Sequence, residues 1–174
     1  FSVEENQTAV GTVTATDADS SNISFTVSGA ELGITSAGIL SFKVAPDYEV
    51  TSSYSATVTV SDGTNPALPA ITVSVTDIDD TAPAIISSAI FIVPENRVTI
   101  GTVKATDVDS SSISFTVSGT ELDITSAGVL SFVSAPDREI KSSYSATVTA
   151  SDGTNASSQK MSVTVTEASD INNP

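Results

Sequence analysis

Pairs of acidic residues at alternate positions stand out in this sequence as side chains that could hold a metal ion. Asp17-Ala-Asp19 and Asp47-Tyr-Glu49 each place two carboxylates two residues apart. In an extended segment both members of such a pair point to one side, where they repel each other in water and chelate a hard cation well. Calcium takes about six to eight oxygen ligands, whereas magnesium keeps more water. The sequence has no His and no Cys, so an all-oxygen set favours calcium over zinc or copper.

The same carboxylates recur in two copies of a long repeat. The segment Phe1-Ser-Val-Glu-Glu-Asn6 returns as Phe91-Ile-Val-Pro-Glu-Asn96, an offset of 90 residues that needs no gap. The acidic positions of the first copy are Glu5, Asp17, Asp19, Asp47, Glu49 and Asp62, and those of the second are Glu95, Asp107, Asp109, Asp137, Glu139 and Asp152. The segment Asp77-Ile-Asp-Asp-Thr-Ala-Pro83 joins the copies. Residues 84–90 have no counterpart before Phe1, which predicts a piece of a longer array.

Turn formation and sugar hydrolysis are alternative roles for these carboxylates. Each Asp-x-Asp pair could be turn chemistry, because Asp side chains bond nearby backbone and tolerate turn geometry. Asp47 and Glu49 could also be a catalytic carboxylate pair of a glycosidase. Neighbouring alternate residues do not place an acid and a nucleophile on opposite sides of a sugar, and no aromatic platform accompanies them. The repetition of all the acidic motifs favours metal binding, and we expect no enzyme.

Composition excludes several classes of function. The chain has 21 Asp and Glu against 6 Lys and Arg, a formal net charge of −15. This charge argues against nucleic acid and against electrostatic docking on an anionic membrane. Disulfides and thiol catalysis are impossible without Cys. The longest apolar stretch, 84–93, is interrupted by Ser87 and Ser88 and is too short for a span of about 20 residues.

Strands must position the carboxylates, because the apolar residues alternate with polar ones throughout both copies. Tyr54-Ser-Ala-Thr-Val-Thr-Val60 is the clearest example, and no window carries a helical pattern. About seven short strands in each copy predict an all-β chain of two tandem, seven-stranded antiparallel Greek-key sandwiches. We expect the first repeat to occupy 1–80, without the start of its first strand, and the second to occupy 81–174.

These motifs together resemble the cadherin extracellular repeat. The resemblance rests on Pro94-Glu95-Asn96, Asp-x-Asp, Asp137-Arg-Glu139 and the linker Asp-x-Asp-Asp-x-x-Pro, in the family's order and over nearly the whole chain. Ala45-Pro-Asp-Tyr-Glu49 followed by Ser61-Asp-Gly63 looks like the cadherin-like repeats of large bacterial surface adhesins. There is no Trp, so the strand exchange through an N-terminal Trp does not transfer.

The resemblance implies calcium ligands at the junction and at two outer half-sites. The junction set would be Glu5, Asp47, Glu49, Ile78, Asp79, Asp80, Thr81, Asp107, Asp109 and Asp152. Ile78, Thr81 and the loop 110–112 would offer carbonyl oxygens, and Asp77 would cap the cluster. The outer half-sites would be Asp17, Asp19 and Asp62, and Glu95, Asp137 and Glu139. The segment Glu167-Ala-Ser-Asp170 keeps only part of the linker pattern, and Asp170-Ile-Asn-Asn-Pro174 would supply a shifted version of it.

The expected function is mechanical. Repulsion between crowded carboxylates would leave the linker mobile, and calcium would turn the pair into a stiff segment of a secreted or surface adhesion protein. Its partners would be neighbouring repeats, with surface glycans or homophilic contacts as further candidates. One alternative is an accessory carbohydrate-binding module of a secreted polysaccharide-degrading enzyme, and a glycan-binding face would then show exposed aromatic rings. Homophilic adhesion through the sandwich faces is the other, and it would require calcium-dependent self-association.

Overall fold

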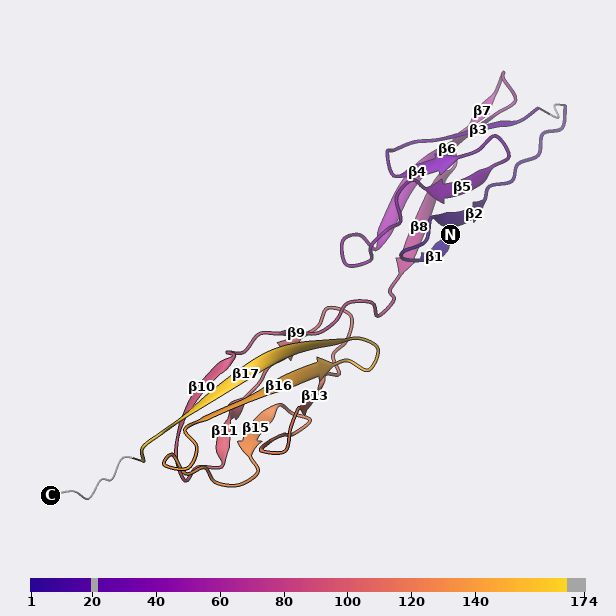
Figure 1. The fold of residues 1–174 in the computed structure, drawn as a ribbon. Helices are drawn as coiled ribbons and strands as arrows, with labels where there is room; N and C mark the ends of the chain where they lie inside the picture. The colour runs from indigo at the N-terminus through magenta and orange to yellow at the C-terminus, as the bar shows by residue number, and fades with distance from the viewer. Residues whose placement is uncertain (20–21, 169–174) are drawn as a thin grey trace. The chain divides into compact units, whose positions relative to one another are not determined.

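The fold was analysed in a computed structural model that describes residues 1–19 and 22–168. The chain divides into two compact units, unit 1 (Phe1–Ile78) and unit 2 (Asp79–Pro174). The described residues form strands, turns and bends without any helix, as the sequence predicts (Figure 1). The described residues accordingly include no helix long and apolar enough to cross a membrane. The shifted version of the linker pattern expected at 170–174 lies outside the described residues.

Unit 1 is a sandwich of two sheets. One sheet has the strand order β1-β8-β6-β3, with β7 beside β6, and the other has the order β2-β5-β4. The strands are β1 (Ser2–Glu4), β2 (Ala9–Thr12), β3 (Ser24–Val27), β4 (Leu32–Ile34), β5 (Ile39–Phe42), β6 (Ser53–Ser61), β7 (Pro66–Ala67) and β8 (Ala70–Thr76).

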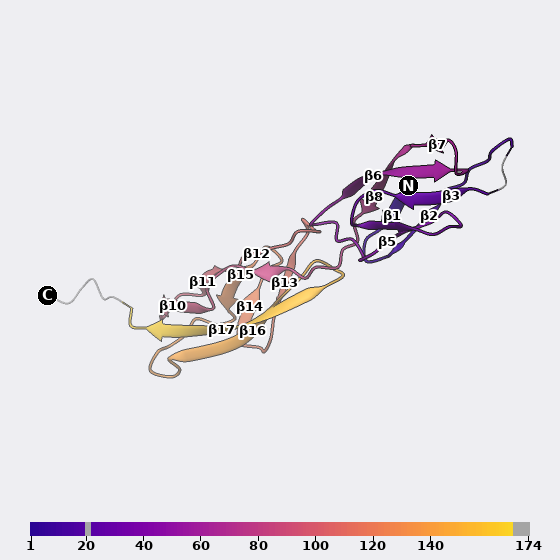
Figure 2. The same cartoon turned by 90° about the horizontal axis from the view of Figure 1, so that it is seen from above.

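Unit 2 repeats this arrangement. Its larger sheets have the orders β10-β17-β16-β13 and β11-β15-β14 (Figure 2). In addition, β9 pairs with β12. The strands are β9 (Ala84–Ile85), β10 (Ile90–Pro94), β11 (Thr99–Thr102), β12 (Ala105–Thr106), β13 (Ser114–Val117), β14 (Leu122–Ile124), β15 (Val129–Phe132), β16 (Ser143–Ser151) and β17 (Ala156–Thr166).

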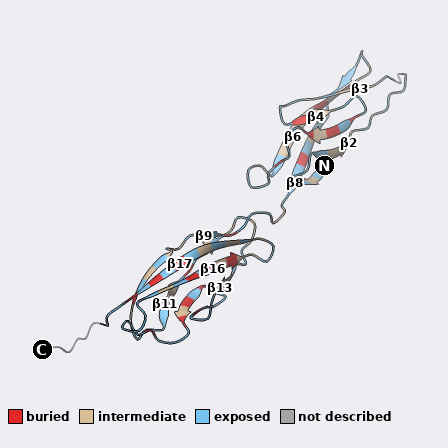
Figure 3. Ribbon diagram, in the orientation of Figure 1, coloured by how far each residue is buried: buried red, intermediate tan, exposed pale blue. Residues whose placement is uncertain are grey.

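Each unit has its own core, made by the inward residues of the alternating strands (Figure 3). On β8, Val73 and Val75 are buried while Thr72 and Ser74 are exposed. Leu40 and Phe42 of β5 are buried as well. The alternation therefore identified the inward face correctly, since successive strand residues point to opposite faces.

Strand β1 of unit 1 and its counterpart β10 of unit 2 each pair in parallel with the last strand of their unit, whereas the sequence predicts antiparallel sheets. β1 runs parallel to β8, with Glu4 opposite Thr76, and β10 runs parallel to β17, with Pro94 opposite Thr166. The other ladders are antiparallel. Alternation carries no information about strand direction, so the sequence pattern could not reveal this pairing. Its consequence is functional, because β1 and β8 end at the same end of unit 1.

The two units differ in their last strand. Unit 2 has one 11-residue strand, β17, where unit 1 has two pieces, β7 and β8. Pro69 lies between the pieces, and its counterpart Gln159 lies inside β17. Proline has no N–H to donate to a sheet, so Pro69 explains the interruption.

Candidate metal centre

Glu5 is the most buried of the predicted ligands in unit 1. Only 1% of the surface of Glu5 is exposed to solvent. One carboxylate oxygen, Oε2, accepts the amide of Tyr48 at 2.8 Å, and Oε1 accepts the amide of Ile78 at 2.8 Å. Two amide donors compensate for the loss of hydration of a buried carboxylate. Each oxygen keeps a second lone pair, so these hydrogen bonds leave capacity for a cation.

The parallel pairing of β1 with β8 brings further carboxylates to this end of unit 1. A carboxylate oxygen of Glu49 lies within 4.8 Å of one of Glu5, and also within 4.8 Å of one of Asp77. Asp47 holds the intervening loop, because its Oδ1 accepts the Val50 amide at 3.1 Å. Asp77, to which the sequence assigned only a capping role, is thus close to Glu49.

In unit 2 the linker residues lie against Asp109. Its Oδ2 accepts the amides of Asp80 at 3.2 Å and Thr81 at 2.8 Å. Asp107, two residues earlier, holds the loop itself: its Oδ1 accepts the amides of Asp109 and Ser110, both at 2.9 Å. The Asp-x-Asp pair therefore serves turn chemistry and linker attachment at once.

Asp152 and Asn155 hold the start of unit 2 from the β16–β17 turn. Asp152 Oδ1 accepts the amides of Thr154 and Asn155, both at 2.6 Å. The Asn155 side chain donates to the backbone oxygen of Asp79 at 3.0 Å and to its Oδ1 at 3.3 Å. Thr154 Oγ1 donates to the other carboxylate oxygen of Asp79 at 3.1 Å. Sequence reasoning missed the role of Asn155, although its recurrence in Ser-Asp-Gly-Thr-Asn was the available signal.

Two carboxylate oxygens of this cluster have no protein partner. Oδ2 of Asp107 and Oδ2 of Asp152 are both buried and accept no hydrogen bond. Buried polar atoms are nearly always satisfied, so each exception needs an explanation such as an ion or a water. Aspartate oxygens and carbonyls are the ligands that calcium prefers. The residues present in unit 2 therefore fit a hard divalent cation.

The outer half-site of unit 1 also gathers its three predicted carboxylates. Oxygens of Asp17, Asp19 and Asp62 lie within 4.8 Å of one another. The amides of Asn65 and Thr64 donate to Asp62 at 2.8 and 2.7 Å. These backbone hydrogen bonds hold the pKa of Asp62 below its ordinary value, because they stabilise the charged form.

The outer half-site of unit 2 is assembled differently. Oxygens of Glu95, Glu139 and Glu167 lie within 4.8 Å of one another. Asp137 instead holds its own loop, with its Oδ1 accepting the amide of Glu139 at 3.0 Å. Arg138 pairs with Glu167 and approaches Glu139 at 3.9 Å. A guanidinium thus already neutralises part of the charge that a calcium ion would meet there.

The aromatic rings of the chain mostly face the two cores. Phe1 and Tyr48 are the exposed rings, and the other seven are buried or half-buried. Tyr48 has no aromatic counterpart, because Arg138 occupies its position in unit 2. Among the described residues, neither unit presents the cluster of exposed rings that the carbohydrate-binding alternative requires.

Comparison with known proteins identifies the class to which this fold belongs. No family model matches the chain. Mouse protocadherin Fat 4 is 33% identical in an alignment of 163 residues that covers 81% of this chain and 3% of that protein. Repeats EC22–24 of mouse cadherin-23 are 26% identical with a TM-score of 0.78, covering 97% of this chain and 63% of the other.

A third match supports the same fold. Repeats EC1–2 of human protocadherin-24 have a TM-score of 0.83 at 18% identity, covering 97% of this chain and 94% of the other. Units 1 and 2 are therefore cadherin-like repeats with the immunoglobulin-like sandwich of cadherin domains. The chain spans only a small part of the curated relative it matches.

Proposed function

We propose that this chain is a calcium-binding pair of cadherin-like repeats and a calcium-stiffened segment of an extracellular adhesion protein. The observation that carries the proposal is the pair of buried, unpartnered oxygens on Asp107 and Asp152. Cadherin relatives make an adhesive, extracellular role the natural context. The finer proposal of a bacterial surface protein rests on the sequence Ala45-Pro-Asp-Tyr-Glu49 followed by Ser61-Asp-Gly63.

The proposed ligands come from both sides of the linker. Unit 1 would contribute the carboxylates of Glu5, Asp47 and Glu49 and the carbonyl of Ile78. Unit 2 would contribute the carboxylates of Asp79, Asp80, Asp107, Asp109 and Asp152 and the carbonyl of Thr81. We propose the outer half-sites, Asp17, Asp19 and Asp62, and Glu95, Asp137 and Glu139, as ligands shared with neighbouring repeats.

The function would follow from charge. Without a cation, the carboxylates around the linker repel one another and favour separated arrangements of the two units. A bound calcium ion supplies the positive charge that lets these oxygens approach. Extracellular modules of this type bind calcium with dissociation constants on the order of 10⁻⁴ to 10⁻³ M. Calcium that binds only the folded form also raises the free energy of unfolding.

Isothermal titration of calcium into metal-stripped protein tests the proposal. We expect saturable binding of about three ions. Asp152→Asn abolishes the binding of at least one of these ions or lowers its affinity at least tenfold, because the substitution takes away a charged oxygen ligand. Asp62→Asn is the matched control, since Asp62 is the counterpart of Asp152 in unit 1. This control leaves the junction ions unchanged. Absence of binding at millimolar calcium refutes the proposal.

A further inference from the structure

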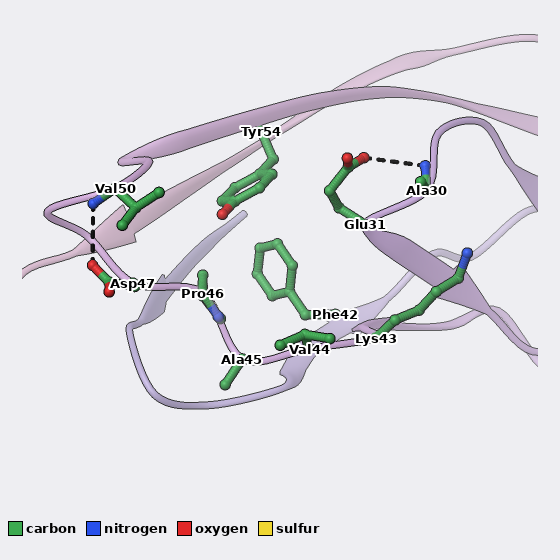
Figure 4. A pocket seen from close by; sticks show the side chains of 10 residues that line it. All are labelled: Ala30, Glu31, Phe42, Lys43, Val44, Ala45, Pro46, Asp47, Val50 and Tyr54. Atoms are coloured by element: carbon green, nitrogen blue, oxygen red, sulfur yellow. Dashed lines mark hydrogen bonds between the residues drawn. The ribbon is translucent and has the colours of Figure 1, made fainter.

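Unit 1 carries a hollow whose aromatic rings and Glu31 take no part in the proposed calcium binding, although Asp47 also lines it. It has a volume of about 330 Å³ and opens between the β5–β6 loop and the start of β4 (Figure 4). Phe42 and Tyr54 form its floor, with their ring centroids 4.8 Å apart in an edge-to-face arrangement. Glu31 adds a carboxylate to the rim. An apolar floor with a carboxylate at its rim can bind an apolar side chain that ends in a positive charge.

Unit 2 has the same floor and the same carboxylate. Phe132 and Tyr144 repeat the ring pair at 4.9 Å and the same 69° interplanar angle. Glu121 is the counterpart of Glu31. The hollow at this place in unit 2 is smaller, about 220 Å³.

A lysine of unit 2 occupies the equivalent position. Lys141 Nζ lies 2.6 and 2.7 Å from the two carboxylate oxygens of Glu121. The same ammonium lies 4.6 Å from the centre of the Tyr144 ring. Its neighbours thus supply both an ion pair and a cation–π contact.

The counterpart of Lys141 in unit 1 is Thr51, which cannot make these contacts. The backbone of the two loops is alike, because the Thr51 amide donates to the Asp47 carbonyl at 2.9 Å and the Lys141 amide donates to the Asp137 carbonyl at 2.9 Å. The difference between the two hollows therefore lies in the side chain. The Glu31 carboxylate accepts the neighbouring amide of Ala30 at 3.1 Å, where Glu121 binds an ammonium.

Lys43 is a lysine beside the hollow of unit 1, but it does not make the contacts that Lys141 makes in unit 2. Lys43 lines the hollow, but its ammonium points away from Glu31 in Figure 4. No ion pair joins Lys43 to Glu31 in the described part of the chain. The net charge of −15 adds a long-range attraction for basic partners.

We propose that the hollow of unit 1 binds a lysine side chain of a basic partner protein. The ammonium of that lysine pairs with Glu31 and lies over Tyr54, as the ammonium of Lys141 pairs with Glu121 and lies over Tyr144 within unit 2. Unit 1 thereby offers to another protein the contact that unit 2 makes with itself. This inference concerns one unit and does not depend on calcium binding.

An NMR titration of the ¹⁵N-labelled chain tests the inference. The probe is Nα-acetyl-lysine methylamide, and Nα-acetyl-norleucine methylamide is the uncharged comparison. We expect the lysine probe to shift the amides of Ala30 and Lys43 saturably, with no saturable shift at Thr120 or Val133. The norleucine probe binds at least about fivefold more weakly, because it lacks the ion pair and the cation–π contact.

Variants identify the groups responsible. Glu31→Gln weakens binding of the lysine probe at least about fivefold, whereas Glu121→Gln leaves the response of unit 1 unchanged. Thr51→Lys abolishes binding, since the introduced side chain fills the hollow from within. Lys141→Thr creates a second binding site that shifts Thr120 and Val133.

Several results would overturn the inference. Equal binding of the two probes, an unchanged response in Glu31→Gln, or no new site in Lys141→Thr would each contradict it. Sedimentation could also show that the chain associates with itself and that Thr51→Lys abolishes this association. The bound lysine would then belong to a second copy of this chain, and the proposal of a different partner protein would be refuted. The titration is run with millimolar calcium and again with chelator. Failure in both conditions refutes the lysine site while leaving the calcium proposal to be judged by calorimetry.

Discussion

Glu5 shows how one residue can have a structural role before any ion is considered. It is buried, and its two oxygens accept amides from the 46–51 loop and from the residues after β8. The equivalent Glu95 accepts the amides of Arg138 at 3.0 Å and Ala168 at 3.3 Å. In both units this Glu therefore joins the end of the strand that it follows, β1 or β10, to a loop and to the residues after the last strand.

Removal of the Glu5 carboxylate is expected to destabilise unit 1 even without calcium. Glu5→Ala leaves the amides of Tyr48 and Ile78 without their acceptor, at a cost of about 2–4 kcal/mol in the free energy of unfolding. Glu5→Gln keeps one acceptor oxygen and costs about half as much. Urea unfolding in chelator, followed by NMR signals of unit 1, measures both changes. Unchanged stability of Glu5→Ala in chelator would show that Glu5 is only a metal ligand.

Asp107 differs from Glu5, because one of its carboxylate oxygens is buried without a hydrogen-bond partner. Asp107→Asn keeps an oxygen for the amides of Asp109 and Ser110 and removes a negative charge from a carboxylate cluster. We expect the metal-free stability of unit 2 to stay the same or rise by about 1 kcal/mol. In Asp107→Asn, we expect calcium to raise the free energy of unfolding of unit 2 much less than it does in the unaltered chain. Thermal unfolding with and without calcium measures both effects.

The matched control for this prediction is Asp17→Asn. Asp17 is the counterpart of Asp107 but is exposed and belongs to unit 1, so its substitution changes neither the metal-free stability of unit 2 nor the stabilisation of unit 2 by calcium by more than about 0.5 kcal/mol. A loss of metal-free stability in Asp107→Asn would mean that the charge itself holds the loop. That result would contradict the assignment of its buried oxygen to a cation.

At the scale of strands, the sequence predicted the inward faces well because alternation reports burial directly. It could not predict that β1 pairs in parallel with β8, since direction depends on the path of the whole chain. The recurring acids identified Asp17, Asp19 and Asp62, which the structure brings together. The contact of Asn155 with Asp79 and the pairing of Lys141 with Glu121 were missed, because both depend on segments far apart in sequence.

Pro69 and Gln159 provide a test at this scale. Gln159 lies opposite Val148 within the ladder of β16 and β17. Gln159→Pro removes the N–H at this position and should interrupt β17 as Pro69 interrupts unit 1, lowering the stability of unit 2 by about 1–3 kcal/mol. Gln159→Ala is the control, because it keeps the N–H and removes a side-chain oxygen that is buried without a partner. Native-state hydrogen exchange of the β16 amides distinguishes them, and equal effects would contradict the assignment of the interruption to proline.

For the whole molecule, the central feature is an excess of negative charge arranged at repeated positions. The net charge of −15 disfavours compact arrangements of like-charged parts. Calcium at the linker would change that balance locally, and outer half-sites would extend it from repeat to repeat. Arg138 pairs with Glu167 and neutralises part of the negative charge there. We therefore expect the site at the end of unit 2 to bind calcium more weakly than the junction.

The most direct test of this account is the distance between the two units with and without calcium. The chain has no Cys, so spin labels attached to Ser55→Cys and Ser145→Cys, at exposed positions of β6 and β16, report on one pair of sites by pulsed electron paramagnetic resonance. We predict a broad distance distribution in chelator and a narrow one in millimolar calcium. Adding Asp80→Ala keeps the distribution broad in calcium. The same distribution in both conditions would contradict the proposal that calcium stiffens this pair of repeats.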